Sequence, residues 1–107
     1  MMEQRIMTAL SALDLPVAQN VYTGAETTFL TFNFDVYPRA YRDDLPTAEH
    51  YAAQAHLYAP HDTDTTALRA RIIAALTGAG FPRPSVLNIA DEYAQHLVFE
   101  FGDEEVI

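Results

Sequence analysis

A nine-residue aromatic stretch, Phe29 to Tyr37, constrains the fold more than any other part of this chain. Residues at its even positions are all apolar, whereas those at its odd positions include threonine, asparagine and aspartate. Because alternate side chains of a β-strand point to opposite faces of a sheet, the pattern predicts a strand with one face on the core. That face consists of Leu30, Phe32, Phe34 and Val36. At ~3.3 Å per residue the strand is about 30 Å long, so we expect it to extend beyond its own core.

A polar segment, Pro38 to Thr47, separates this strand from a second alternating stretch, His50 to Ala59. Prolines cannot donate to a sheet ladder, so we expect the polar segment to be a loop or a protruding hairpin tip, not part of a central strand. The second stretch alternates apolar with polar residues. It predicts an antiparallel partner for the aromatic strand.

Helical patterns lie on both sides of these strands. Apolar residues at helical spacing predict one helix from Met2 that ends before Pro16, and a second helix after Asp64 that ends at Gly78 and Gly80. Residues 86–90 and 93–101 have the composition of strands.

We therefore predict one α+β domain that spans residues 1–107. Its antiparallel sheet has three to four strands with two helices packed on it, in the order α-β-β-α-β(β).

Composition restricts the classes of function. Six Lys and Arg against fifteen Asp and Glu give a net charge of −9, which disfavours binding to nucleic-acid phosphates and to anionic membranes. The chain has no cysteine, so it has neither disulfides nor thiolate metal sites. We expect neither a signal peptide nor a membrane span near the N-terminus, because no apolar run follows Arg5.

Histidines and paired carboxylates are the candidate catalytic or metal-binding groups. His50 and His56 share a strand face but lie roughly 20 Å apart on a regular strand, too far for one coordination sphere. The pairs Asp43-Asp44 and Asp91-Glu92 fall in predicted turns, where acids are usually solvated. We expect no catalytic, metal or cofactor site, although His56 or His96 beside a carboxylate across the sheet would keep an enzyme possible.

Aromatic and charged residues gather around the expected hairpin tip. Tyrosine and arginine are enriched at protein interfaces, which makes this cluster a candidate contact surface. Its members are Tyr37, Arg39, Tyr41, Arg42, Asp43 and Asp44.

Together, the order and spacing of several segments resemble the tail-completion proteins of long-tailed bacteriophages and prophages, also described as tail-terminator or head-tail joining proteins. The likeness covers roughly residues 15 to 101. The segments are Pro16-Val17, Val21-Tyr22-Thr23-Gly24, Thr28-Phe29-Leu30-Thr31-Phe32, the Asp43-Asp44 loop, Gln54-Ala55-His56-Leu57-Tyr58, Gly80-Phe81, Asp91-Glu92 and His96-Leu97-Val98-Phe99.

The resemblance implies a structural protein of the virion and not an enzyme. Such a monomer assembles with itself into a six-membered ring at the end of the tail tube, terminates the tail and joins it to the head connector. Its partners would be the tail tube protein and the head connector proteins, with no cofactor, no specific nucleic acid and no membrane. It would act in the host cytoplasm during assembly. A net charge of −9 suits a ring through which DNA passes, because attraction to phosphates would slow the DNA.

A different class of function stays open from the same composition. An acidic protein-binding module or DNA mimic could inhibit a nucleic-acid enzyme. Against it, the second helix carries Arg69 and Arg71 and no acid after Asp64, so acids do not follow one face at phosphate-like spacing.

Overall fold

The computed structural model describes residues 2–42 and 45–106, which form two helices and five strands. In chain order they are α1 (Met2–Ser11), β1 (Val17–Gln19), β2 (Phe29–Arg42), β3 (Leu45–Ala59), α2 (Thr66–Gly78), β4 (Ser85–Asn88) and β5 (Gln95–Val106). The predicted α+β class is confirmed.

One sheet contains all of these strands in the order β1-β2-β3-β5-β4. Its β2–β3, β3–β5 and β4–β5 pairs are antiparallel, as predicted, but β1 pairs in parallel with β2, so the sheet is mixed. The prediction of three to four strands was too low, because it did not include β1. Three residues are too short for alternation to show in a sequence, and β1 is held by backbone bonds such as Leu30 N–H to Pro16 O at 2.8 Å.

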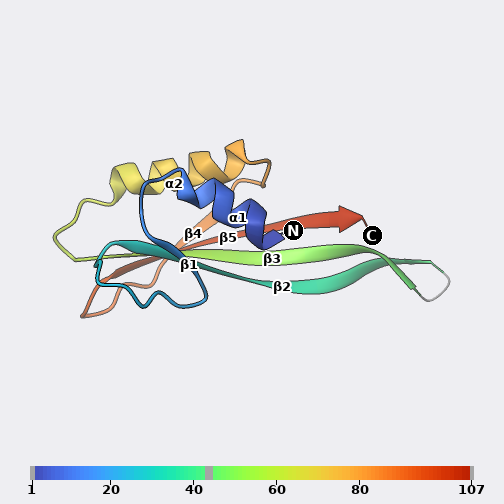
Figure 1. The fold of residues 1–107 in the computed structure, drawn as a ribbon, viewed down its shortest axis with the longest axis horizontal. Helices are drawn as coiled ribbons and strands as arrows, with labels where there is room; N and C mark the ends of the chain where they lie inside the picture. The colour runs from blue at the N-terminus through green and yellow to red at the C-terminus, as the bar shows by residue number, and fades with distance from the viewer. Residues whose placement is uncertain (1, 43–44, 107) are drawn as a thin grey trace.

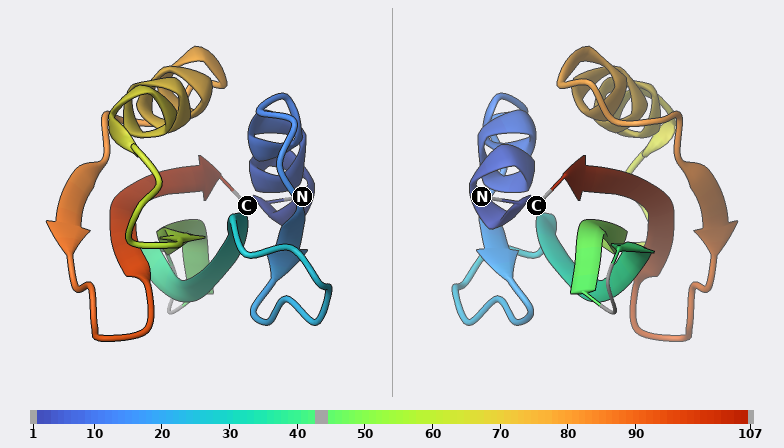
Figure 2. Two further views of the ribbon diagram at one scale, coloured as in Figure 1. Left: turned by 90° about the vertical axis from the view of Figure 1, so that its left-hand side faces the viewer. Right: turned by 90° about the vertical axis from the view of Figure 1, so that its right-hand side faces the viewer.

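Both helices lie on the same face of the sheet, as the two end-on views in Figure 2 show. The core therefore forms between this helix-covered face and the helices. Fully buried members include Ile6 and Leu10 from α1, Ile72 and Leu76 from α2, and Leu30, Phe32, Ala55 and Phe99 from the sheet. Leu97, Phe99 and Phe101, at alternate positions of β5, are buried as well.

The end of α2 follows from its glycines. Gly80 has a φ of 95°, a left-handed conformation that favours glycine, and directly follows the cap residue Ala79. The Gly80 N–H donates to Thr77 O and the Phe81 N–H donates to Leu76 O, which satisfies two carbonyls that the helix leaves open. Phe81 then turns into the core, where its ring meets Phe101 edge-on at 5.0 Å.

Residues Pro38 to Thr47 were predicted to form a loop or a protruding hairpin tip. The loop was wrong for most of that segment, because β2 runs to Arg42 and β3 starts at Leu45, which makes the segment the projecting end of the β2–β3 hairpin. Leu30 N–H and Phe32 C=O both bond toward β1, so even residues of β2 direct their backbone groups away from β3. The register of the β2–β3 pair continues without a bulge through Pro38↔Glu49. The backbone nitrogen of Pro38 therefore faces the outer side of β2, and its missing N–H removes no hydrogen bond to β3.

The molecule is elongated, 55 × 25 × 23 Å, because β2, β3 and β5 continue beyond the helices (Figure 1). The expectation that the aromatic strand outreaches its core is thus confirmed. Val36 points to the same face of β2 as the buried Leu30 and Phe32. The helices end before they reach Val36, and its side chain is 41% exposed. The prediction of Val36 as a core residue was wrong for this reason.

Candidate functional site

The part of the sheet beyond β1 and β4 is the first candidate surface. We call it the arm, and it consists of residues 34–42 of β2, 45–53 of β3 and 101–106 of β5. Exposed apolar side chains lie along it, with exposed fractions of 41% for Val36, 50% for Tyr37 and 68% for Leu45. Apolar side chains at the projecting end of a sheet are typical of a surface that is covered in an assembly.

The structure places the predicted contact residues on this arm as far as it describes them. Tyr37 pairs with His50, and Arg42 is exposed opposite Leu45. The backbones of Arg39 and Tyr41 belong to β2. Asp43 and Asp44 lie outside the described residues.

On the face that the helices leave uncovered, three polar side chains form a line across the sheet. Asn33 of β2, His56 of β3 and His96 of β5 are joined by hydrogen bonds, with His56 Nε2 3.0 Å from Asn33 Oδ1 and His56 Nδ1 2.8 Å from His96 Nε2. His56 stands opposite Thr31 and Val98, so each of its partners is a diagonal neighbour. The sequence singled out both histidines, but their proximity depends on the strand register and Asn33 was not recognised.

The protonation of this line follows from its acceptors. His56 donates its Nε2–H to Asn33 Oδ1, so the Nδ1 of neutral His56 accepts the hydrogen bond that the Nε2–H of His96 donates. Burial, together with the charge of His96, lowers the pKa of His56. Burial also lowers the pKa of His96, partly offset by the carboxylate of Asp91. These lowered pKa values favour the neutral form of both rings.

Aromatic rings continue this site along the same face. Tyr22, Phe29, Tyr58 and His96 stack in sequence with centroid distances of 4.5, 4.9 and 4.2 Å. A hollow of about 340 Å³ lies beside Phe29 and Tyr58, lined also by Glu26, Pro60 and Tyr93. Stacking and partial burial fix these rings, and burial and Asp91 raise the pKa of the Tyr58 phenol.

Where the arm begins, the uncovered face is hollowed again. This second depression, of about 490 Å³, is lined by polar groups that include Asn33, Asp35, Gln54 and Glu100. It extends onto the arm, where Asp35 and His50 line it, and its two carboxylates suit neither a phosphate nor another anion.

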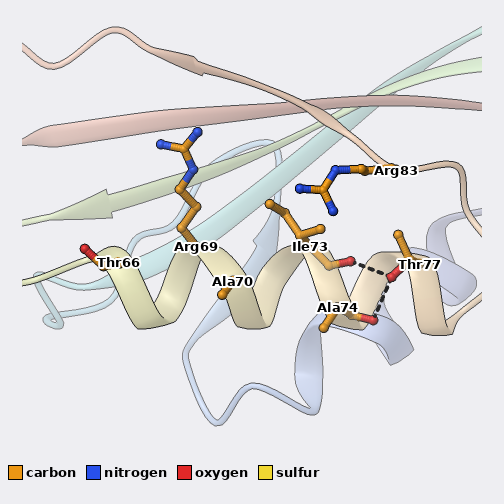
Figure 3. A pocket seen from close by; sticks show the side chains of 7 residues that line it. All are labelled: Thr66, Arg69, Ala70, Ile73, Ala74, Thr77 and Arg83. Atoms are coloured by element: carbon orange, nitrogen blue, oxygen red, sulfur yellow. Dashed lines mark hydrogen bonds between the residues drawn. The ribbon is translucent and has the colours of Figure 1, made fainter.

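A third hollow, about 400 Å³, lies on the outer surface of α2 (Figure 3). Arg69 and Arg83 stand on the same side of the helix with Ile73 between them, and the hydroxyl of Thr77 is turned back to the carbonyls of Ile73 and Ala74. Two of the six basic residues of the chain are thus collected beside small apolar side chains.

Carboxylates close to the histidines have structural roles. Asp91 accepts hydrogen bonds from the backbone N–H groups of Tyr93 and Ala94, which shape the β4–β5 turn and lower the pKa of Asp91. Among the side chains that the structure describes, no three His, Asp or Glu groups come together as ligands for a metal ion. Over the same residues, no helix has the length and apolar character needed to cross a bilayer.

Comparison with known proteins gives a likeness of fold. No family model matches the chain, and neither does any curated protein. Solved structures do match, and one of them superposes with a TM-score of 0.65 at 15% identity, over 99% of this chain and 90% of that chain. That protein bears no functional name, and an identity this low indicates a shared fold alone.

Proposed function

We propose that this protein is a structural component of a phage or prophage virion. Copies of it form a ring, taken to be six-membered, at the end of the tail tube, where the ring terminates the tail and joins it to the head connector. The role is mechanical and requires no catalytic group or cofactor. The observation that carries the proposal is the arm, which projects past both helices with Val36, Tyr37 and Leu45 exposed.

The projecting arm supports a role in assembly for a physical reason. The helices cover one sheet face only as far as the first residues of the arm, where Ala53 and Phe101 are buried. The outer part of the arm therefore adds exposed apolar surface without adding to the core of the monomer. Such surface is unfavourable in water unless another molecule covers it. A chain of 107 residues has little stability to spare, and burial against neighbours would add to it.

The resemblance of ordered segments over residues 15 to 101 supports the same role. It requires an α+β monomer, which is the fold observed. The net charge of −9 supports passage of DNA through the ring without binding to it.

Electron microscopy of purified phage tail tubes incubated with the protein tests the proposal. We expect density at one end of the tube and an arrest of further tube growth. Native mass spectrometry of the same samples should give the number of copies per tube end. A tube that gains no end density and keeps growing in the presence of excess protein would refute this function.

The competing function, an acidic inhibitor of a nucleic-acid enzyme, predicts a different result in a binding experiment. Immobilised protein would then retain a nuclease or polymerase from a lysate, and DNA would displace that enzyme. For the ring protein, we expect retention of tail components that DNA does not displace.

A further inference from the structure

Two open backbone edges run along the arm. β1 pairs with β2 only as far as Phe32, and β4 pairs with β5 only as far as Glu100. Beyond these residues, β2 and β5 each have β3 on one side and no partner strand on the other side within the described part of the chain. Unpaired strand edges are templates for pairing with another chain.

The backbone groups that point outward on each edge can be assigned from the ladder. On β2 they belong to the even residues, as the bonds of Leu30 and Phe32 to the β1 side show. On β5 they also belong to the even residues, because His96 O accepts the N–H of Ile89 on the β4 side. The open edge of β2 therefore presents Phe34, Val36, Pro38 (carbonyl only), Ala40 and Arg42, and that of β5 presents Gly102, Glu104 and Val106.

Charge distinguishes the ways in which these edges could meet. The arm part of β5 contains three consecutive acidic residues, Asp103 to Glu105, whereas the outer half of β2 contains Arg39 and Arg42. Two β5 edges would bring like charges together, and so would two β2 edges, whereas a β5 edge and a β2 edge carry opposite charges. Charged residues and Pro38 disfavour contacts between two β2 edges or between two β5 edges. They do not disfavour a contact between a β5 edge and a β2 edge.

We propose that the β5 edge of one copy pairs in parallel with the β2 edge of the next copy, an inference that rests on the proposed ring. β2 and β5 run in the same direction within each copy because both are antiparallel to β3. Parallel pairing keeps the helices of both copies on one face of the continued sheet, whereas antiparallel pairing of these two edges would invert one copy. The contact joins different surfaces on the two copies, and contacts of this kind close into rings where the rotation between successive copies permits.

The register follows when neighbouring arms stand at equal height. Within one copy, Val36 and Asp103 are both paired with Tyr51, so they mark the same level of the sheet. Val36 of the next copy would then lie beside Asp103, donating to Gly102 O and accepting from Glu104 N–H. Pro38 of the next copy would accept from Val106 N–H and leave Glu104 O without a donor.

Engineered cysteines test this register directly, since the chain has no cysteine of its own. Adjacent residues of a parallel ladder share a face, at a Cα separation that a disulfide can bridge. We expect the double variant Val36→Cys, Asp103→Cys to cross-link under mild oxidation into a ladder of products that ends at the ring size, both alone at high concentration and on tail tubes. The matched control Tyr37→Cys, Asp103→Cys places its cysteines on opposite faces and should stay unlinked.

A gain of function gives a second test that misfolding cannot imitate. Pro38→Ala adds an N–H on the open edge, opposite the unpaired carbonyl of Glu104 in the proposed contact. We expect a severalfold lower concentration for half-assembly in sedimentation experiments, with particles of the same size. Unchanged or weaker assembly of Pro38→Ala would contradict the pairing, and open-ended aggregates would show unregulated edge contact instead.

The outcomes separate this inference from the function on which it rests. Rings at the tube end without cross-links in Val36→Cys, Asp103→Cys would overturn the edge pairing and keep the ring. Cross-linked dimers from Asp103→Cys alone would show that two β5 edges pair and would also overturn it. If the chain neither caps tubes nor cross-links at high concentration, both proposals fail.

Discussion

The Nδ1 of His56 lies 2.8 Å from the Nε2 of His96, on the sheet face that neither helix covers. The bond needs one nitrogen as donor and the other as acceptor, so it is lost when both nitrogens carry a proton. Asn33 Oδ1 takes the remaining N–H of His56. Three strands are thereby connected by one chain of hydrogen bonds that depends on pH.

We expect the free energy of unfolding to fall as the pH decreases below 6.5, the ordinary value for histidine. Burial lowers the pKa of both His56 and His96 in the folded state, so the unfolded chain binds protons more readily. The stability that the neutral pair contributes is complete above the unfolded value and is lost as the pH falls through the folded values. Urea unfolding between pH 7.5 and pH 5 measures this slope.

The double variant His56→Gln, His96→Gln should flatten that slope. His61→Gln serves as its control, because His61 is exposed and outside the pair. An unchanged pH dependence in the double variant would show that other groups cause the acid sensitivity.

How much of this arrangement the sequence could predict depends on the range of the interaction. Alternation identified the strands and the core face of Leu30 and Phe32, since each residue reports its own face. The joining of His56 to His96 depends on the β3–β5 register, which the pairing of distant residues decides. No local pattern contains that information.

The errors of the sequence prediction have a similar cause. Proline rules assigned Pro38 to a loop because they hold for central strands, but the outer side of β2 is open at that level. Val36 continues the apolar parity of the strand beyond the point where helices cover it. The tolerance of Pro38 in a strand and the exposure of Val36 both depend on which helices and strands lie next to β2, and the whole fold decides that.

Gly80→Ala should destabilise the protein by about 1 kcal/mol, because an alanine at a φ of 95° is strained. Gly78→Ala is the matched control within the same helix end. An added Cβ meets nothing within 4 Å at either position, so backbone conformation alone separates the two. Gly78→Ala should stabilise by about 0.5–1 kcal/mol in thermal unfolding. Equal effects of the two variants would contradict this account of the helix end.

Gln95 fastens the start of β5 to the segment that leads into α2. Its Nε2 donates to Pro60 O at 2.7 Å and to Thr63 O at 2.6 Å, and its Oε1 accepts from Thr65 Oγ1 at 3.2 Å. Gln95→Ala leaves part-buried groups without partners, and we expect a loss of about 1–3 kcal/mol in chemical denaturation. The exposed Gln4→Ala should change stability by less than about 0.5 kcal/mol. A neutral Gln95→Ala would mean that water replaces these bonds.

Phe99 is fully buried at the centre of β5, where it stands opposite Ala55. Phe99→Ala should cost about 3–5 kcal/mol, because it removes apolar contact and leaves a cavity. Tyr93→Ala, at a position that is 83% exposed, should stay within about 0.5 kcal/mol of the parent. Calorimetric unfolding of both variants decides whether the core extends under β5 as described.

Changing Tyr41 and Arg42 together to alanine should impair assembly while the monomer stays folded. Both residues lie near the end of the arm, Arg42 is exposed, and this level of the sheet lies beyond the helices. Tube capping should therefore fall at least tenfold, whereas the midpoint of thermal unfolding should stay within a few degrees of the parent.

The exposed residue Glu92, in the turn between β4 and β5, provides the control. Glu92→Ala should preserve both capping and stability. If the arm variant loses thermal stability in proportion to its loss of capping, the arm supports the fold of the monomer, and the division between a folded base and a contacting arm is wrong.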